Sequence, residues 1–198
     1  MKNKILFLML ALVFVFSGCG KDENEASVAR QEDYSLPAYS KNEIDLFLNA
    51  HSTNKFSNEI ITLAQIENVL KAAVNSPDLS GGQNCHFTTV ISEEYMKQIV
   101  PEATKGCAVI IVSAKSENII DSAFGAQSIF LSSQAMGFGA KISTNNIDVI
   151  NSSNLKQFLG IPEGYNAVCA VCVGHPDKND LSNTPDEINI NDYVNYIE

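Results

Sequence analysis

The sequence has little positive charge. Its 198 residues contain 13 Lys and Arg residues against 23 Asp and Glu residues, and the formal net charge at pH 7 is −10. It contains no basic stripe and no nucleic-acid-binding motif. Because nucleic acids and anionic lipids are themselves negative, such a surface repels both. Nucleic-acid binding is therefore excluded as the function.

The sequence also lacks the motifs of nucleophilic catalysis. Its three histidines, His51, His86 and His175, are not accompanied by a Gly-x-Ser-x-Gly elbow or a comparable nucleophile motif. No Ser/His/Asp or Cys/His triad is therefore indicated. No catalytic side chain is assigned from the sequence.

The N-terminus predicts export. Two lysines precede an apolar run, residues 5–16, which is too short for a comfortable membrane span. Two small residues then precede Cys19, as in the signal peptides of bacterial lipoproteins. We expect residues 1–18 to be a signal peptide and Cys19 to carry lipid, which tethers an extracytoplasmic protein to a membrane. An uncleaved anchor or ordinary cleavage is the alternative.

A solvated spacer is expected to follow the lipid. Residues 19–40 are acidic and poor in apolar side chains, which is typical of a flexible linker. Without Lys2 and Lys4 the net charge of the chain is −12, so the lipid alone is expected to contact the membrane. Residues 41–198 remain, enough for one domain with a sizeable core.

A Cys-x-x-Cys pair lies within a short apolar run, Ala167–Val173. Such a run predicts a buried strand, on which residues three apart point to opposite faces. The sulfurs of Cys169 and Cys172 are therefore expected to lie apart, as structural core residues. A zinc site that also uses His175 fails for the same reason, so no metal ligand is predicted.

The other cysteines leave the disulfide state open. An exported protein can form disulfides, and Cys85 with Cys107 is one example if their strands are neighbours. Connectivity does not follow from the spacing of cysteines in a sequence. We therefore predict no specific bridge.

Hydrophobic periodicity predicts mixed secondary structure. Thr62 and Gln65 form the capping box of an amphipathic helix. The β-branched run from Cys107 to Val112 is typical of a central strand that is covered on both faces. Helices are expected at 42–48, 62–74, 92–100, 119–136 and 152–158, and strands at 87–91, 107–112 and 167–173. This mixture indicates an α+β or α/β sandwich around a sheet.

Four segments, in order over residues 43–175, match motifs of one known protein family. His51-Ser52-Thr53-Asn54-Lys55-Phe56 is similar to an opening Arg-(Arg/His)-Ser-x-(Arg/Lys)-x-(Phe/Tyr) motif. Ser76-Pro77 through Gln83 to His86-Phe87 resembles a Pro-Ser-x-x-Asn-x-Gln-Pro-Trp-x-Phe loop and strand. The other two segments are Gly125–Gly139, similar to a central helix, and Leu159–Tyr165 followed by Val173–Pro176, similar to the family's ending. Together these segments resemble the FMN-dependent nitroreductase family.

The resemblance implies a fold, a cofactor and an assembly. The implied fold is α+β, an α/β/α sandwich with a central mixed sheet flanked by helices. Members of this family are homodimers that bind FMN at the subunit interface and pass electrons from NAD(P)H to nitroaromatics, quinones or similar small acceptors. The residues that match cofactor-binding positions, or lie in segments that pass the flavin, are His51, Ser52, Asn54, Gly81, Gln83, Ser143, Thr144 and Asn145.

The departures from the family concern the FMN phosphate. Ala50 and Asn54 stand where the opening motif has basic residues, and residues 179–186 contain no Lys or Arg where the family has a late basic pair. Gly81 replaces the loop Asn, and Asn84-Cys85 replaces Pro-Trp. A charge-assisted contact contributes about 1.5–3 kcal/mol, so losing two or three lowers affinity by on the order of 10²–10⁴.

Two hypotheses follow. In the first, the chain is an exported FMN-dependent oxidoreductase whose electrons come from NAD(P)H or from a donor protein. In the second, it is a non-catalytic lipoprotein that kept the nitroreductase fold, lost FMN and serves as a binding or interaction module.

Overall fold

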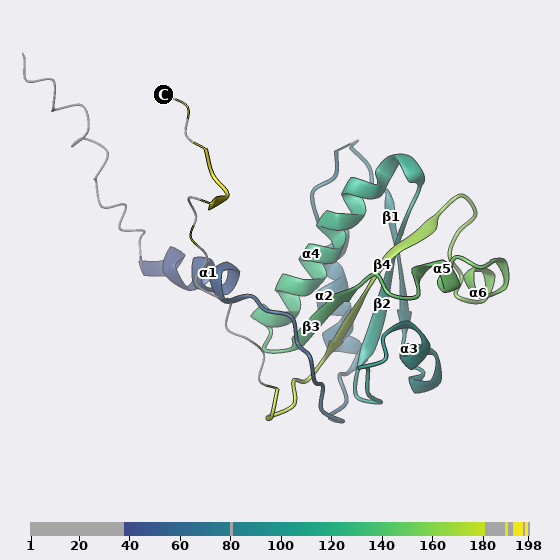
Figure 1. The fold of residues 1–198 in the computed structure, drawn as a ribbon, viewed down its shortest axis with the longest axis horizontal. Coiled ribbons are helices and arrows are strands. Elements are labelled where there is room, and N and C mark those ends of the chain that lie inside the picture. The colour runs from purple at the N-terminus through teal and green to yellow at the C-terminus, as the bar shows by residue number, and fades with distance from the viewer. Residues whose placement is uncertain (1–37, 80, 181–188, 190–191, 196, 198) are drawn as a thin grey trace, which may run out of the picture. The chain divides into compact units, whose positions relative to one another are not determined.

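The computed structural model describes residues 38–79, 81–180, 189, 192–195 and 197 (Figure 1). The predicted signal peptide, the lipidation site Cys19 and the spacer as far as residue 37 lie outside the described residues. Among the described residues, no helix is long and apolar enough to cross a membrane.

A four-stranded sheet forms the middle of the domain. Its strands are β1 (Cys85–Val90), β2 (Ala108–Ala114), β3 (Gly139–Ser143) and β4 (Asn166–Gly174), in the order β1-β2-β4-β3. All three pairings between these strands are antiparallel. The expectation of a mixed sheet is therefore wrong for the described residues, because neighbouring strands run in opposite directions in every pair.

The two central strands are the apolar runs of the sequence. All seven residues of β2 are buried, because its side chains point alternately into two separate cores. Val109 and Ile111 belong to one core, whereas Ile110 and Val112 belong to the other. The expectation of a strand covered on both faces is confirmed.

Helices cover both faces of the sheet, which gives the predicted α/β/α sandwich. The core on one face includes residues of α2 (Leu63–Val74) and α4 (Ile119–Ala135). The core on the other face includes residues of α3 (Glu93–Ile99) and α5 (Ile147–Ile150), with α6 (Ser153–Phe158) packed against it. Figure 1 shows the sheet between these two groups. The chain reaches the sandwich through α1 (Ala38–Asn49), and a 3-10 turn, Ser116–Asn118, precedes α4.

The predicted capping box fixes the start of α2. The Thr62 N–H donates to Gln65 Oε1 at 2.8 Å, and the Gln65 N–H donates to Thr62 Oγ1 at 3.3 Å. A cap of this kind stabilises a helix by about 1 kcal/mol. Ile66, Val69 and Ala73 then share the buried face of α2.

The central helix α4 lies close to the sheet because of its small residues. A methyl group on Gly125 would lie 3.1 Å from the ring of Phe87 in β1, so the glycine admits this close approach. Ala126, Ile129 and Ser133 are buried along the same side of the helix. This packing fixes where the ends of α4, and the loops attached to them, lie relative to the sheet.

Candidate functional site

The segment that contains His51, Ser52 and Asn54 runs beside the start of edge strand β3. The Thr53 N–H donates to the Ala140 carbonyl at 2.9 Å, and the Ala140 N–H donates to Thr53 Oγ1 at 3.1 Å. Thr53 is 2 % exposed, whereas Ser52 and Asn54 on either side of it are exposed. The burial of Thr53 therefore turns its two neighbours outward.

The same segment is also tied to the chain that follows β4. The Ser57 N–H donates to the His175 carbonyl at 2.8 Å, and the Asp177 N–H donates to the Lys55 carbonyl at 2.9 Å. Phe56 forms an isolated bridge with Pro176 and is buried. The opening motif is thus held as an extra, irregular strand at one end of the sheet.

His51 is held through its backbone. Its N–H donates to Gln134 Oε1 at 3.3 Å, and Gln134 Nε2 donates to the His51 carbonyl at 2.9 Å. Its ring Nδ1 lies 2.9 Å from the Asn49 carbonyl oxygen. The side chain of α4 residue Gln134 therefore fixes the point at which the chain enters the site.

Ser143, Thr144 and Asn145 lie at the far end of β3. Ser143 is buried, and its Oγ accepts a hydrogen bond from the Asn145 N–H at 3.2 Å. Thr144 and Asn145 are exposed. Four residue steps of about 3.3 Å along β3 place this group roughly 13 Å from the opening motif. The edge of β3 thus carries neutral polar side chains at both ends.

The loop that contains Gly81 and Gln83 lies elsewhere. It leads into β1, and the strand order places β1 and β3 at opposite edges of the sheet. Three strand spacings of about 4.8 Å separate those edges by roughly 14 Å. Within one protomer the structure therefore brings together six of the eight predicted residues along β3 and leaves Gly81 and Gln83 apart from them.

The amide of Gln83 already has partners in its own loop. Its Nε2 donates to the Val74 carbonyl at 2.7 Å, and its Oε1 accepts from the Cys85 N–H at 3.1 Å. Both ends of the amide therefore fasten the loop between α2 and β1. Its predicted contact with a cofactor stays a prediction.

Two aspartates that hold the loop were not recognised from the sequence. Asp78 Oδ1 accepts from the Gly81 N–H and, at 2.9 Å, from the Gly82 N–H. Asp121, in the first turn of α4, is only 3 % exposed, and its carboxylate accepts from the Leu79 N–H at 2.9 Å. An Asp in a first helical turn is ordinary, so the sequence carries no signal for this burial.

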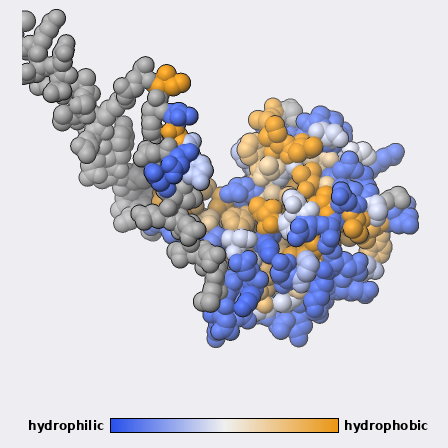
Figure 2. Space-filling view, in the orientation of Figure 1, coloured by the Kyte–Doolittle hydropathy of each residue, from blue (hydrophilic) through white to orange (hydrophobic). Residues whose placement is uncertain are grey.

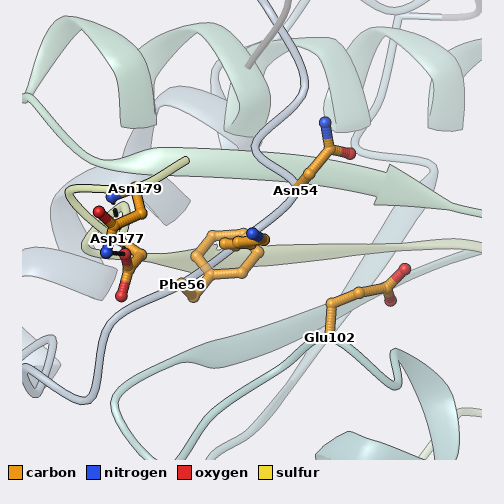
Figure 3. Close-up of a pocket in the computed structure, with 6 residues that line it drawn as sticks. Asn54, Phe56, Glu102, Asp177 and Asn179 are labelled. Atoms are coloured by element: carbon orange, nitrogen blue, oxygen red, sulfur yellow. Dashed lines mark hydrogen bonds between the residues drawn. The ribbon is translucent and has the colours of Figure 1, made fainter. Parts of the chain in front are cut away.

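The phosphate end of an FMN site does not fit the residues that are present. Asn54 stands where a basic side chain is expected, and its N–H, which could meet a phosphate oxygen, donates to Asp180 Oδ2 at 3.2 Å. Beside it lies an open groove of about 400 Å³. Figure 3 shows Phe56 between the Asp177–Asn179 turn and Glu102 in this groove. Among the described residues, this end of the site therefore offers neutral and acidic groups rather than a cationic phosphate cradle.

The cysteines follow the alternation of β4. Cys169 belongs to the core beneath α2 and α4, and Cys172 to the opposite core, so the prediction that their sulfurs lie apart is confirmed. All four cysteines of the described part of the chain are free. The example of a Cys85–Cys107 bridge is wrong, because Cys85 pairs with Ala114 at the far end of β2 from Cys107.

Cys107 and Cys172 are neighbours in one core. The Cys172 thiol donates to Cys107, which lowers the pKa of Cys107 and raises that of Cys172. Thr104 assists, because its N–H lies 3.4 Å from the Cys107 sulfur. Gly174 leaves room for this sulfur, since a methyl group there would lie 2.8 Å from it. Within the described chain, no three His, Cys, Asp or Glu side chains converge as metal ligands.

An antiparallel sheet with helices on both faces forms a three-layer sandwich. Among solved structures, the chain resembles an FMN-bound nitroreductase from Bacteroides fragilis, with a TM-score of 0.66 and 14% identity over 78% of this chain and 98% of that one. An FMN-dependent nitroreductase from Clostridium difficile gives a TM-score of 0.64 and 21% identity over 80% of this chain and 100% of that one.

Sequence comparison finds a relative with a similar name. An Archaeoglobus fulgidus protein, named as a candidate NADH dehydrogenase/NAD(P)H nitroreductase, is 26% identical over an alignment of 153 residues that covers 70% of this chain and 88% of that protein. A scan against models of known protein families finds no match. The chain has the nitroreductase fold, and its resemblance to the nitroreductase family is confirmed in sequence and in structure.

Proposed function

We propose that this chain is a flavin-dependent oxidoreductase of the nitroreductase type. The observation that carries the proposal is the edge of β3, where the opening motif and residues 143–145 offer neutral polar groups roughly 13 Å apart. A flat flavin ring with its side arm can lie along such an edge. A bound flavin supplies the electron transfer, so the protein need only bind, orient and shield it.

Each part of the edge has a distinct task in this proposal. The hydroxyl of Ser52 and the amide of Asn54 hydrogen-bond the side arm, and the exposed Thr144 and Asn145 face the ring. Gly81 and Gln83 come from the opposite sheet edge, so they reach the flavin of a second copy. A homodimer is therefore part of the proposal.

The electron acceptor is proposed to be a small nitroaromatic, a quinone or a similar molecule. NAD(P)H is the donor that the name of the Archaeoglobus relative suggests. For an exported protein, a donor protein is the alternative, because free NAD(P)H is scarce outside the cytoplasm. The direct test is anaerobic reduction of the flavin-loaded protein with dithionite, followed by addition of a quinone or a nitroaromatic. Reoxidation faster than that of the same concentration of free flavin supports the proposal.

A non-catalytic role is the second candidate function. The carboxylate of Asp180 on the opening motif favours it, since this contact occupies a group that an FMN site would use. In that case the protein would bind flavin without accelerating its reoxidation, or would not bind flavin at all. The same reoxidation experiment therefore separates the two functions.

We further propose that the protein is exported and anchored by lipid on Cys19. The basic start, the short apolar run and the small residues before Cys19 support this location. Radiolabelled palmitate should be incorporated into the protein and should be lost in Cys19→Ser. Equal labelling of the two proteins, or recovery of the native protein in the cytoplasmic fraction, would contradict the anchor.

A further inference from the structure

The side chain that contacts the opening motif from the turn after β4 is a carboxylate, which has the wrong sign to bind a phosphate. The Asp180 carboxylate accepts a hydrogen bond from the Asn54 N–H at 3.2 Å, and the turn that carries it is closed by a bond from the Asp180 N–H to the Asp177 carbonyl at 2.9 Å. Asp177 lines the groove beside Asn54. Two carboxylates thus lie at the end of the site where FMN carries its dianion.

The lysines near the groove, Lys55, Lys141 and Lys178, only balance the carboxylates of Glu102, Asp177 and Asp180 in number. The direct contact of Asp180 with Asn54 is therefore what opposes a phosphate. Lys141 Nζ lies 2.6 Å from Oε1 of Glu102, which lines the same groove. This contact lowers the pKa of the Glu102 carboxyl. Glu102 is therefore an anion at neutral pH, and it offsets Lys141. Only Lys55 among the residues that line the groove is basic, against the carboxylates of Glu102 and Asp177.

Four exposed hydrogen-bonding side chains beside β3 are uncharged. Ser52, Asn54, Thr144 and Asn145 are neutral hydrogen-bonding side chains, and all four are exposed. A hydroxylated, uncharged side arm can bond to such groups, whereas a phosphate would displace the Asp180 contact and meet like charge. The repulsion is electrostatic, so it acts at short range and falls with added salt.

We propose that the ligand of this site is an unphosphorylated, neutral flavin of the riboflavin type rather than FMN. This inference rests on the proposed flavin function and names the form of flavin on which that function depends. In this proposal, Asp180 disfavours binding of the phosphorylated flavin, FMN.

The test compares riboflavin with FMN on the whole mature protein in detergent, by quenching of flavin fluorescence. Riboflavin should bind at least tenfold more tightly than FMN at low ionic strength. Adding salt should tighten FMN binding and leave riboflavin binding unchanged. FMN binding as tight as riboflavin binding would overturn this inference alone, and binding of neither flavin would overturn the proposed function as well.

A charge reversal tests the role of Asp180. Asp180→Lys should raise FMN affinity tenfold or more and change riboflavin affinity less than threefold. Glu163→Lys is the matched control, because Glu163 is exposed and precedes the opposite end of β4. Asp180→Asn, which keeps the size of the side chain, should give a smaller gain in FMN affinity. Equal FMN affinities for the native protein and both Asp180 variants would contradict the proposed role.

Discussion

At the scale of single residues, the position of the opening motif depends on the absence of a side chain at residue 139. A methyl group on Gly139 would lie 2.5 Å from Thr53 Oγ1, too close for any real contact. The glycine therefore lets Thr53 sit against β3 and bond to Ala140. The outward direction of Ser52 and Asn54 depends on this contact.

Gly139→Ala should therefore be destabilising. Overpacking of this kind costs about 1–3 kcal/mol in the free energy of unfolding, and urea denaturation measures it. Gly82→Ala is the control, because nothing lies within 4 Å of a methyl group at that position. A Gly139→Ala protein as stable as the Gly82→Ala protein would show that Thr53 does not occupy this space.

The thiol of Cys85, at the start of β1, has a shifted pKa that can be measured. Burial, then the carboxylates of Asp121 and Asp78, raise the pKa of its thiol from 9.0 to about 11. Each cause disfavours the thiolate, so the thiol stays protonated up to higher pH than an ordinary cysteine. Alkylation of Cys85, followed by peptide mass spectrometry, should have its midpoint near 11 in the native protein and near 9.0 in urea.

Asp121→Asn should lower that midpoint without restoring the ordinary value, because burial is the larger cause. A native midpoint near 9.0 would show that Cys85 is not buried beside these carboxylates. The variant thus separates the effect of charge from that of burial.

At the scale of elements, the start of α4 organises the loop before β1. Besides the Leu79 N–H, the buried Asp121 carboxylate accepts from Asn84 Nδ2 at 3.2 Å and from Asn118 Nδ2 at 3.4 Å. One side chain thus joins two points of the loop before β1 to the turn that precedes the central helix. Hydrogen bonds to a charged acceptor contribute about 1.5–3 kcal/mol.

Asp121→Ala should lower the free energy of unfolding by about 2 kcal/mol and expose the loop. Limited proteolysis should then cut between residues 78 and 84 faster than in the native protein. Asp121→Asn keeps one acceptor oxygen, so its cleavage rate should lie between those of the native protein and of Asp121→Ala. Unchanged cleavage in Asp121→Ala would mean that the loop is held by its other contacts, those of Asp78 and Gln83.

Most elements could be predicted because local signals and burial agree. The capping box of α2 and the apolar runs of β2 and β4 appear in the structure close to their expected bounds. Strand β3 was missed because Gly139-Ala140-Lys141-Ile142-Ser143 is short and has a single β-branched residue. Its pairing with β4, and with Thr53 on its other side, makes it a strand.

The site was less predictable than the fold. His51, Ser52 and Asn54 could be named because they lie in a motif with a recognisable order. Ser143, Thr144 and Asn145 were named only from the place of their segment in the resemblance. The acceptor role of Asp180 could not be predicted. It depends on a turn after β4 that brings Asp180 to Asn54, from which it is 126 residues away in the sequence. Long-range contacts of this kind leave no periodic signal in the chain.

At the scale of the whole molecule, one copy does not gather all eight predicted residues. Hydrophobic side chains gather over the N-terminal half of α4 (Figure 2). Ile119, Ile120, Phe124 and the nearby loop residue Leu79 are all exposed there. Contiguous apolar surface of this kind is typical of an interface. In the proposed homodimer, a second copy on this face would cover it and bring its own loop to the proposed flavin site.

The protein should therefore be a dimer in detergent, as measured by light scattering corrected for bound detergent. Phe124→Glu should produce monomers and weaken flavin binding at least tenfold, because the site would lose its second loop. Val149→Glu, at an exposed position of α5, is the control that should remain dimeric. A monomeric native protein that still binds flavin tightly would contradict the two-copy site.

Binding of a flavin at the β3 edge is tested most directly by titrating riboflavin or FMN with the purified native protein. Flavin fluorescence is followed against a detergent blank. We expect saturable quenching at micromolar protein, weaker in Ser52→Ala and stronger for riboflavin than for FMN. Fluorescence of both flavins that stays at the level of the blank would contradict the account.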